Sequence, residues 1–420
     1  MDGLSLINRN TSITSKGKIE TTLDLTIHIL CFLSVHLIGA DIWGINIGVN
    51  LRLDQLFLTL LTALLIVNNS YRLRRNYSIT LFLLLSFVSV IFAFDVLRSF
   101  AFYLSIVFNT FCIFYCFYSY ISTYGLNKFI NICRKTIYIQ SILIIIQFLL
   151  RVTTGMTISV FRDYGYYFGI PRFCIWFYEP SFFATYFIFW FAFSIYNLLI
   201  NSNKNYLKDV LLVAVALFLS TSATGYVGAA FSLVLVYLIW ISKNITFKKI
   251  VVLVLIISIA VAMLIVFHNV FEVFIGRIFN NGLNDASGGR VERWLEAYEV
   301  FAEHVLFGVG PGNFGIYLKG DYSYVPSNVT LELMATTGIF ATISFYLILV
   351  EMIVKVYRIN HLNGKGDVGC INSLLFGLII FTIFLQVNQG YLRLYHWMFF
   401  GMIEGACFCF YKERKGTTNV

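Results

Sequence analysis

The residues between 290 and 304 are of types that bind anions and move protons, and their spacing is helical. At about 100° per residue this stretch separates into a basic, an acidic and an apolar stripe. The stripes contain Arg290, Arg293 and His304; Glu292, Glu296, Glu299 and Glu303; and Val291, Trp294, Leu295, Tyr298, Phe301, Ala302 and Val305. Arg290 opens the helix, where free amide groups and the helix dipole favour an anion. An ordinary solvated amphipathic helix remains the alternative interpretation.

A glycine-rich segment follows directly, with glycine at positions 308, 310, 312 and 315. It resembles a phosphate-binding loop only superficially, because no strand precedes it and no Lys-Ser/Thr pair follows it. The pattern instead predicts a tight turn that uses the freedom of glycine at positive φ.

The elements that must position these residues are membrane spans. The chain of 420 residues is 59% hydrophobic and only 12% charged, which is too apolar for a soluble fold and sufficient for about twelve spans of about 20 residues. Apolar runs of that length begin near residues 23, 51, 78, 99, 136, 181, 207, 224, 249, 327, 370 and 396. We therefore expect an all-α polytopic membrane protein, a single integral membrane domain over 1–420.

The orientation follows from the basic residues. Seven alternating segments, including both terminal arms, contain 20 of the 30 lysines and arginines, so the positive-inside rule places both termini in the cytoplasm. The net charge of +9 is therefore a matter of topology, and no nucleic-acid partner is expected. Glu404, near the middle of the last span, is expected to have a structural partner within the bundle.

The ten outer basic residues are nine arginines and Lys319, whereas the inner ones are 13 lysines and 7 arginines. Lysine suffices for topology, but the planar guanidinium can grip phosphate with two hydrogen bonds. The bias points to a phosphate-bearing ligand at the outer face, with codon bias and small numbers as the alternative. Arg98 lies in a short outer turn outside any motif, and we expect it to matter little.

Two outer segments are long, 152–180 and 271–326, and long loops in a compact bundle tend to hold function. In the second, the helix at 290–304 is expected to lie on the bundle or at the membrane interface by its aromatic face. No outer cluster of carboxylates, histidines or cysteines has metal-ligand spacing, so no metal and no cofactor are expected.

Several motifs together resemble the O-antigen polymerase and ligase superfamily. They are Ser220-Thr-Ser-Ala-Thr-Gly225, Arg290-xxx-Trp294, His304-Val-Leu-Phe-Gly308-Val-Gly-Pro-Gly312-Asn-Phe314, and Ser327-Asn328 with Leu331-Glu332 and Gly338. Arg172 with Glu179-Pro180-Ser181 resembles a motif of the polymerase (Wzy-type) branch. The resemblance covers roughly residues 170–345.

The resemblance implies a GT-C-like fold in the bacterial inner membrane, with 152–180 and 271–326 as periplasmic loops. It implies glycosyl transfer between oligosaccharides carried on undecaprenyl diphosphate, without a metal. A polymerase moves the growing chain from its lipid diphosphate to the non-reducing end of a fresh lipid-linked unit. Outward arginines would neutralise the departing diphosphate. The expected partners are these lipid-linked oligosaccharides, membrane lipid, and a polysaccharide co-polymerase that regulates chain length.

The resemblance also implies roles for single residues. Arg172, Arg290 and Arg293 would bind the diphosphate, with Arg290 also counted as catalytic. Either Glu179 or His304 would accept the proton of the acceptor hydroxyl. Asn328, Glu332 and Tyr324 would bind sugars, although tyrosines at this depth can equally be interfacial belt residues.

Three other functions remain open. A ligase would transfer finished chains to lipid A core, but ligases of this family carry histidine where this chain has Ser327. A flippase or other transporter usually shows internal repeats and charges near mid-membrane, and neither is evident. A membrane scaffold would not explain the arginine-biased outer face.

Overall fold

The computed structural model describes residues 22–46, 50–158, 161–167, 170–247, 289–363 and 368–417, with positions 249, 251 and 258. This part of the chain is mostly helical, with two short antiparallel hairpins. The first half comprises α1 (Thr22–His36), β1 (Gly44–Asn46), β2 (Asn50–Arg52), α2 (Leu53–Val67), α3 (Tyr77–Ile91), α4 (Val96–Phe108), the π-helix η1 (Asn109–Phe114), α5 (Tyr115–Tyr124), α6 (Leu126–Thr154), β3 (Asp163–Tyr167), β4 (Ile170–Phe173) and α7 (Pro180–Leu199). The second comprises η2 (Lys204–Tyr206), α8 (Leu207–Leu219), α9 (Ala223–Lys243), α12 (Arg290–Glu303), α13 (Phe314–Lys319), α14 (Val329–Asn363), α15 (Gly369–Phe384), η3 (Leu385–Val387) and α16 (Leu394–Thr417).

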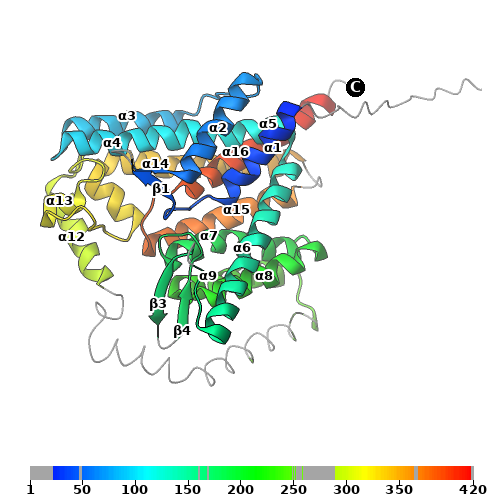
Figure 1. Ribbon diagram of the computed structural model, residues 1–420. Coiled ribbons are helices and arrows are strands. Elements are labelled where there is room, and N and C mark those ends of the chain that lie inside the picture. The colour runs from blue at the N-terminus through cyan, green and yellow to red at the C-terminus, as the bar shows by residue number, and fades with distance from the viewer. Residues whose placement is uncertain are drawn as a thin grey trace, which may run out of the picture.

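Eleven of the twelve expected apolar runs coincide with helices, and the run near 249 lies outside the described residues. Six of the described helices are long and apolar enough to cross a membrane: Val96–Tyr124, Leu126–Thr154, Pro180–Leu199, Ala223–Ser242, Val329–His361 and Gly369–Val387. α1, α2 and α3 are shorter apolar helices. α12 and α13 lie at the opposite end of the molecule from the C-terminal end of α16 (Figure 1).

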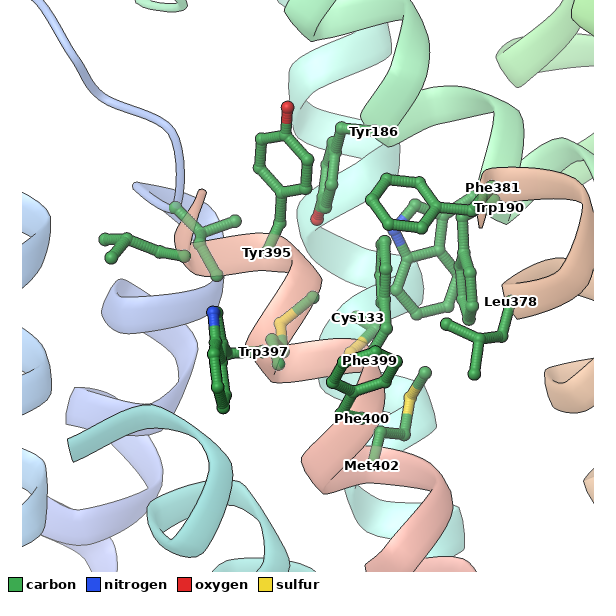
Figure 2. Packing of buried hydrophobic residues seen from close by; sticks show 14 of the residues in the cluster. Cys133, Tyr186, Trp190, Leu378, Phe381, Tyr395, Trp397, Phe399, Phe400 and Met402 are labelled. Atoms are coloured by element: carbon green, nitrogen blue, oxygen red, sulfur yellow. The ribbon is translucent and has the colours of Figure 1, made fainter. Parts of the chain in front are cut away.

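α7 is the centre of the bundle and packs against α8, α9 and α15. Nearly all of its side chains are buried, because neighbours cover every side of this aromatic-rich helix. Figure 2 shows Tyr186 and Trp190 of α7 beside Phe381 of α15 and the aromatic residues of α16. Phe189 stacks on Phe399 with ring centroids 3.7 Å apart. This rigid centre fixes the position of the N-terminal end of α7, where Glu179 lies.

From the end of the small-residue motif Ser220–Gly225 onward, α9 packs closely against α7. A Cβ atom on Gly225 would lie 3.1 Å from the Cβ of Ala184, and one on Gly228 would lie 2.3 Å from Ile188. The glycines therefore serve close helix packing, which any larger side chain would obstruct.

The glycine-rich segment forms the predicted tight turn, and Gly308, Gly310 and Gly312 all have positive φ. It is inserted into a break in α14 at Gly338, whose own φ is 77°. The amides of Val309 and Gly310 donate to carbonyls of α14 at 3.0 and 2.9 Å. The turn therefore anchors the outer loop to the bundle, which explains its glycines without any ligand.

Arg98, expected in a short outer turn where it would matter little, lies in the first turn of α4 and has a structural role. Its Nε donates to the carbonyl of Gly312 at 2.7 Å, and its guanidinium lies over the rings of Phe102 and Tyr322. The turn between α3 and α4 contacts the outer loop only in the folded bundle, so the sequence around Arg98 carried no signal of this bond.

The expected partner of Glu404 is Lys355, so that prediction is confirmed. The Nζ of Lys355 lies 2.9 and 2.7 Å from the two carboxylate oxygens of Glu404 and 2.7 Å from Glu351. Arg74 approaches Glu404 at 3.3 Å. This network joins α14 and α16 to the segment that precedes α3.

Replacing Lys355 with methionine is expected to destabilise the protein by about 3 kcal/mol, because Glu404 would remain buried with less compensation. The measurement is thermal unfolding of the detergent-solubilised protein. Lys412→Met removes an exposed lysine of the same helix as Glu404 and should leave the unfolding temperature unchanged. Equal unfolding temperatures for the two variants would show that the network contributes no stability.

Candidate functional site

Glu179 is positioned by the start of α7. It is the N-cap residue, Pro180 occupies the first helical position, and Ser181 Oγ donates to Glu179 Oε2 at 3.1 Å. Proline suits this position because its fixed φ is helical and its missing amide hydrogen is not needed there. The Glu-Pro-Ser element therefore orients the carboxylate of Glu179 at the N-terminal end of α7, the most deeply buried helix.

Arg172 lies on β4, which forms a hairpin with β3. In this hairpin Asp163 pairs with Phe173 and Tyr167 with Ile170. From β4 it acts electrostatically on Arg290, and also on Tyr226 at the start of α9. The predicted segment 152–180 thus contains a hairpin that directs an arginine toward the ends of α7, α9 and α12.

Arg290 and Arg293 lie in the first turn of α12. Burial and the nearby charges of Arg293 and Arg172 lower the pKa of Arg290, and the carboxylate of Glu179 acts in the opposite direction. Arg172, Glu179 and Arg293, which are up to 121 positions apart in the chain, thus all act on the charge of Arg290. Arginine remains protonated at physiological pH, so the lowered pKa reports first the burial of this guanidinium and then the positive charges beside it.

The guanidinium of Arg290 forms no hydrogen bond or ion pair with any other residue in the described part of the chain. Arg293 is held from two sides, because its Nε donates to the carbonyl of Gly289 at 3.2 Å and its NH1 to Ser327 Oγ at 3.1 Å. A half-buried guanidinium beside two further arginines is well suited to bind a dianion.

The face by which α12 contacts the bundle differs from the expected one. Ala297 and Val300, on the side of the basic stripe, are buried against Val309, Phe314 and Ala335. Leu295 and Tyr298 of the aromatic stripe are 61% and 59% exposed. Of the two expected places for the aromatic face, the bundle is therefore wrong, because the packing surface offered by α14 takes small side chains. The membrane interface stays a prediction.

His304 is not brought near Arg290. It lies at the C-cap of α12, about 20 Å along the helix from the first turn. Its Nε2 lies 3.0 Å from the hydroxyl of Tyr317, which also donates to Glu303. Residues at opposite ends of one helix cannot act on the same bond.

The three expected sugar-binding residues differ in how much of each side chain is already engaged. Asn328 caps α14 by accepting from Leu331 N at 3.0 Å and donates to the carbonyl of Gln386 at 2.8 Å. Tyr324 donates to Glu296 and accepts from Lys319. Both therefore have structural roles in the described chain.

Glu332 is different, since one of its carboxylate oxygens is buried without a hydrogen-bond partner among the described residues. The backbone of Gly390 and the guanidinium of Arg393 both act on its carboxyl group. An acceptor oxygen left available inside the bundle beside an arginine is the kind of group that a sugar hydroxyl can satisfy.

Sequence reasoning did not predict a second group of charges, formed by Asp41, Asp54, Arg52 and Arg393. Asp41 accepts a hydrogen bond from Arg393 and forms an ion pair with Arg52, each at 2.6 Å, and Arg52 also contacts Asp54 at 2.5 Å. Arg393 in addition lies 3.7 Å from the ring centroid of Phe182 in the first turn of α7. The sequence indicated this group only through the expected position of Arg52 and Arg393 at the outer face. It gave no sign of the pairing itself, because Asp41 and Arg393 are 352 positions apart.

Charges of both groups, the one around Arg290 and the one around Asp41, act on the thiol of Cys174. Burial raises the pKa of this thiol to about 12, with Glu179 and Asp41 adding to the effect and Arg162 and Arg172 opposing it. The site is therefore continuous, with an excess of positive charge around Arg172 and Arg290 and a charge-balanced network around Asp41. The cationic part is suited to a diphosphate and the balanced part to neutral hydroxyl groups.

Part of the chain is similar to a known protein family. Residues 210–346 match the family model described as O-Antigen ligase. The match contains Arg290, Arg293, Ser327 and Glu332 and ends before Arg393. No curated protein matches the chain.

Proposed function

We propose, from the membership of this chain in the O-antigen polymerase and ligase superfamily, that it is a Wzy-type polymerase of a surface polysaccharide. The observation that carries the proposal is the half-buried guanidinium of Arg290, whose side chain has no hydrogen-bond partner among the described residues and whose charge is acted on by Arg172, Arg293 and Glu179. The growing glycan leaves undecaprenyl diphosphate and joins the non-reducing end of an incoming undecaprenyl-diphosphate-linked repeat unit. The apolar helices and the family match are consistent with a membrane protein.

In the proposed reaction the bond between the anomeric carbon and the diphosphate oxygen breaks, and a bond to the acceptor oxygen forms. The three arginines stabilise the negative charge that grows on the departing diphosphate. Glu179 accepts the proton of the acceptor hydroxyl, since it lies beside Arg290 whereas His304 lies at the far end of α12. Glu332, beside Arg393, binds a sugar hydroxyl.

The second candidate is an O-antigen ligase, which the description of the matched family favours. Ser327 argues for the polymerase, because a serine hydroxyl does not titrate near neutral pH and its oxygen here accepts from Arg293. The lipopolysaccharide ladder of a deletion strain decides between the two. Core with one repeat unit attached indicates a polymerase, and core without any O-antigen indicates a ligase.

The proposed topology places the site in the periplasm and both termini in the cytoplasm. We expect an impermeant maleimide to label Ser323→Cys in intact spheroplasts and to label Asn205→Cys only after permeabilisation. Both side chains are exposed, and the native cysteines would first be replaced. The reverse pattern would place the site in the cytoplasm and exclude the proposed substrates.

We also expect catalysis without a divalent metal, because the arginines supply the charge that a metal would otherwise provide. The purified protein should retain its transfer activity in EDTA within about twofold. Loss of activity in EDTA and its recovery with magnesium would show that a metal is required.

A further inference from the structure

A cavity of about 510 Å³ lies at the end of the bundle opposite α12, and the proposed reaction does not use it. It is lined by Asn127, Ile130, Asn131, Asn197, Asn201, Asn203, Tyr206 and Cys370. These residues come from the start of α6, the end of α7, the segment before α8 and the start of α15. Its volume falls within the range of small-molecule sites.

The lining is neutral and rich in amide groups. Asn197 is fully engaged, since it donates to Phe193 O and to Ser373 and accepts from Asn201. The side-chain amides of Asn127 and Asn131 have no hydrogen bond to any residue that the structure describes, and the side chain of Asn203 uses only its oxygen, to cap η2. Amides that both donate and accept, with no charge among them, match the hydroxyl groups of a polyol.

The depth of the cavity is that of lipid headgroups. α6 has 29 residues and is about 43 Å long, whereas the hydrocarbon core of a bilayer is about 30 Å thick. Part of α6 therefore projects beyond the hydrocarbon, and its first turns, which carry the polar residues Asn127, Lys128 and Asn131, are suited to the headgroup region. Arg134 in the third turn binds Asp209 at the start of α8 at 2.6 Å and so joins the two helices beside the cavity.

The groups that flank the cavity follow the order of the parts of a phospholipid. Lysines lie beside the cavity, where a phosphate would lie, and apolar side chains lie farther along, where acyl chains would lie. Lys204 and Lys208 follow the lining residue Asn203, and Lys135 lies one turn beyond Asn131; all three lysines are exposed. Farther along the same two helices, exposed apolar side chains continue toward the membrane centre. They are Ile139, Ile142 and Ile146 on α6, and Leu207, Leu211 and Val215 on α8.

We propose that this cavity binds the headgroup of phosphatidylglycerol from the cytoplasmic leaflet. The glycerol hydroxyls bind the asparagine amides, the phosphate binds the lysines, and the acyl chains lie along α6 and α8. Basic pockets between helix ends on the cytoplasmic side commonly take anionic lipid. The neutral lining distinguishes a polyol headgroup from a simple anion.

The test is native mass spectrometry of the delipidated full-length protein titrated with phosphatidylglycerol, phosphatidylethanolamine and phosphatidylcholine of the same acyl chains. Phosphatidylglycerol is expected to bind about tenfold more tightly than the other two. Equal binding of all three would overturn the proposal. Displacement of bound phosphatidylglycerol by glycerol phosphate at equal concentration would also overturn it, in favour of a soluble metabolite.

Paired substitutions test whether phosphatidylglycerol binds in this cavity. Asn127→Ala with Asn131→Ala should remove the preference for phosphatidylglycerol, and alanine at these exposed helical positions favours the helix. Thr153→Ala with Thr154→Ala, at the other end of α6, should retain the preference, because both hydroxyls bond only to neighbouring residues at that end, Leu149, Leu150 and Met156. Retained preference in the asparagine variant would place the lipid elsewhere and refute the assignment. Lys204→Gln with Lys208→Gln should weaken the binding of phosphatidylglycerol alone.

Discussion

Replacing Arg290 with lysine is expected to lower polymerisation about 100-fold although the charge is retained. Loss of one oriented donor from a site that stabilises developing charge typically costs this much, and a lysine cannot reproduce the two parallel hydrogen bonds of a guanidinium. Arg290 also has no competing partner within the described residues, so its donors are available to the ligand. The measurement is transfer between purified lipid-linked oligosaccharides.

Arg151→Lys is the matched control. Arg151 is another outer arginine, at the end of α6, and it donates to the carbonyl of Gly155 at 3.0 Å. It should retain activity within about twofold, whereas Arg98→Lys is unsuitable because Arg98 supports the glycine-rich turn. If both Arg290→Lys and Arg151→Lys retained activity, the first turn of α12 would be only a solvated surface.

The second large effect is expected at Glu179. Glu179→Gln should abolish polymer, since the loss of a general base costs about 10²–10⁴-fold, while the amount of protein in the membrane stays the same. Glutamine keeps the shape of the side chain and can still accept from Ser181 Oγ. The readout is the polysaccharide ladder with an immunoblot of the same membranes.

His304→Ala should be milder, because His304 contacts Tyr317 at the far end of α12. A normal ladder from Glu179→Gln at normal protein level would remove this carboxylate from the mechanism. Loss of polymer in His304→Ala alone would move the proton acceptor to the other end of the helix and contradict the proposed site.

The sequence by itself determined the helices and the types of residue at the site. The start of α7 at Pro180 and the turns at Gly308 and Gly310 depend on local geometry, and membrane helices follow from runs of apolar residues. The spacing of α12 likewise predicted Arg290 and Arg293 on one side of the helix.

Only the tertiary structure decided which charges meet. The pairing of Asp41 with Arg393 and the approach of Arg172 to Arg290 depend on how α1, α7, α12 and α16 pack. The side of α12 that faces the bundle was also decided there, because small side chains at 297 and 300 fit the surface of α14 better than the aromatic stripe does. Periodicity reports that a helix has distinct sides, whereas contact with a particular neighbour selects the side that is buried.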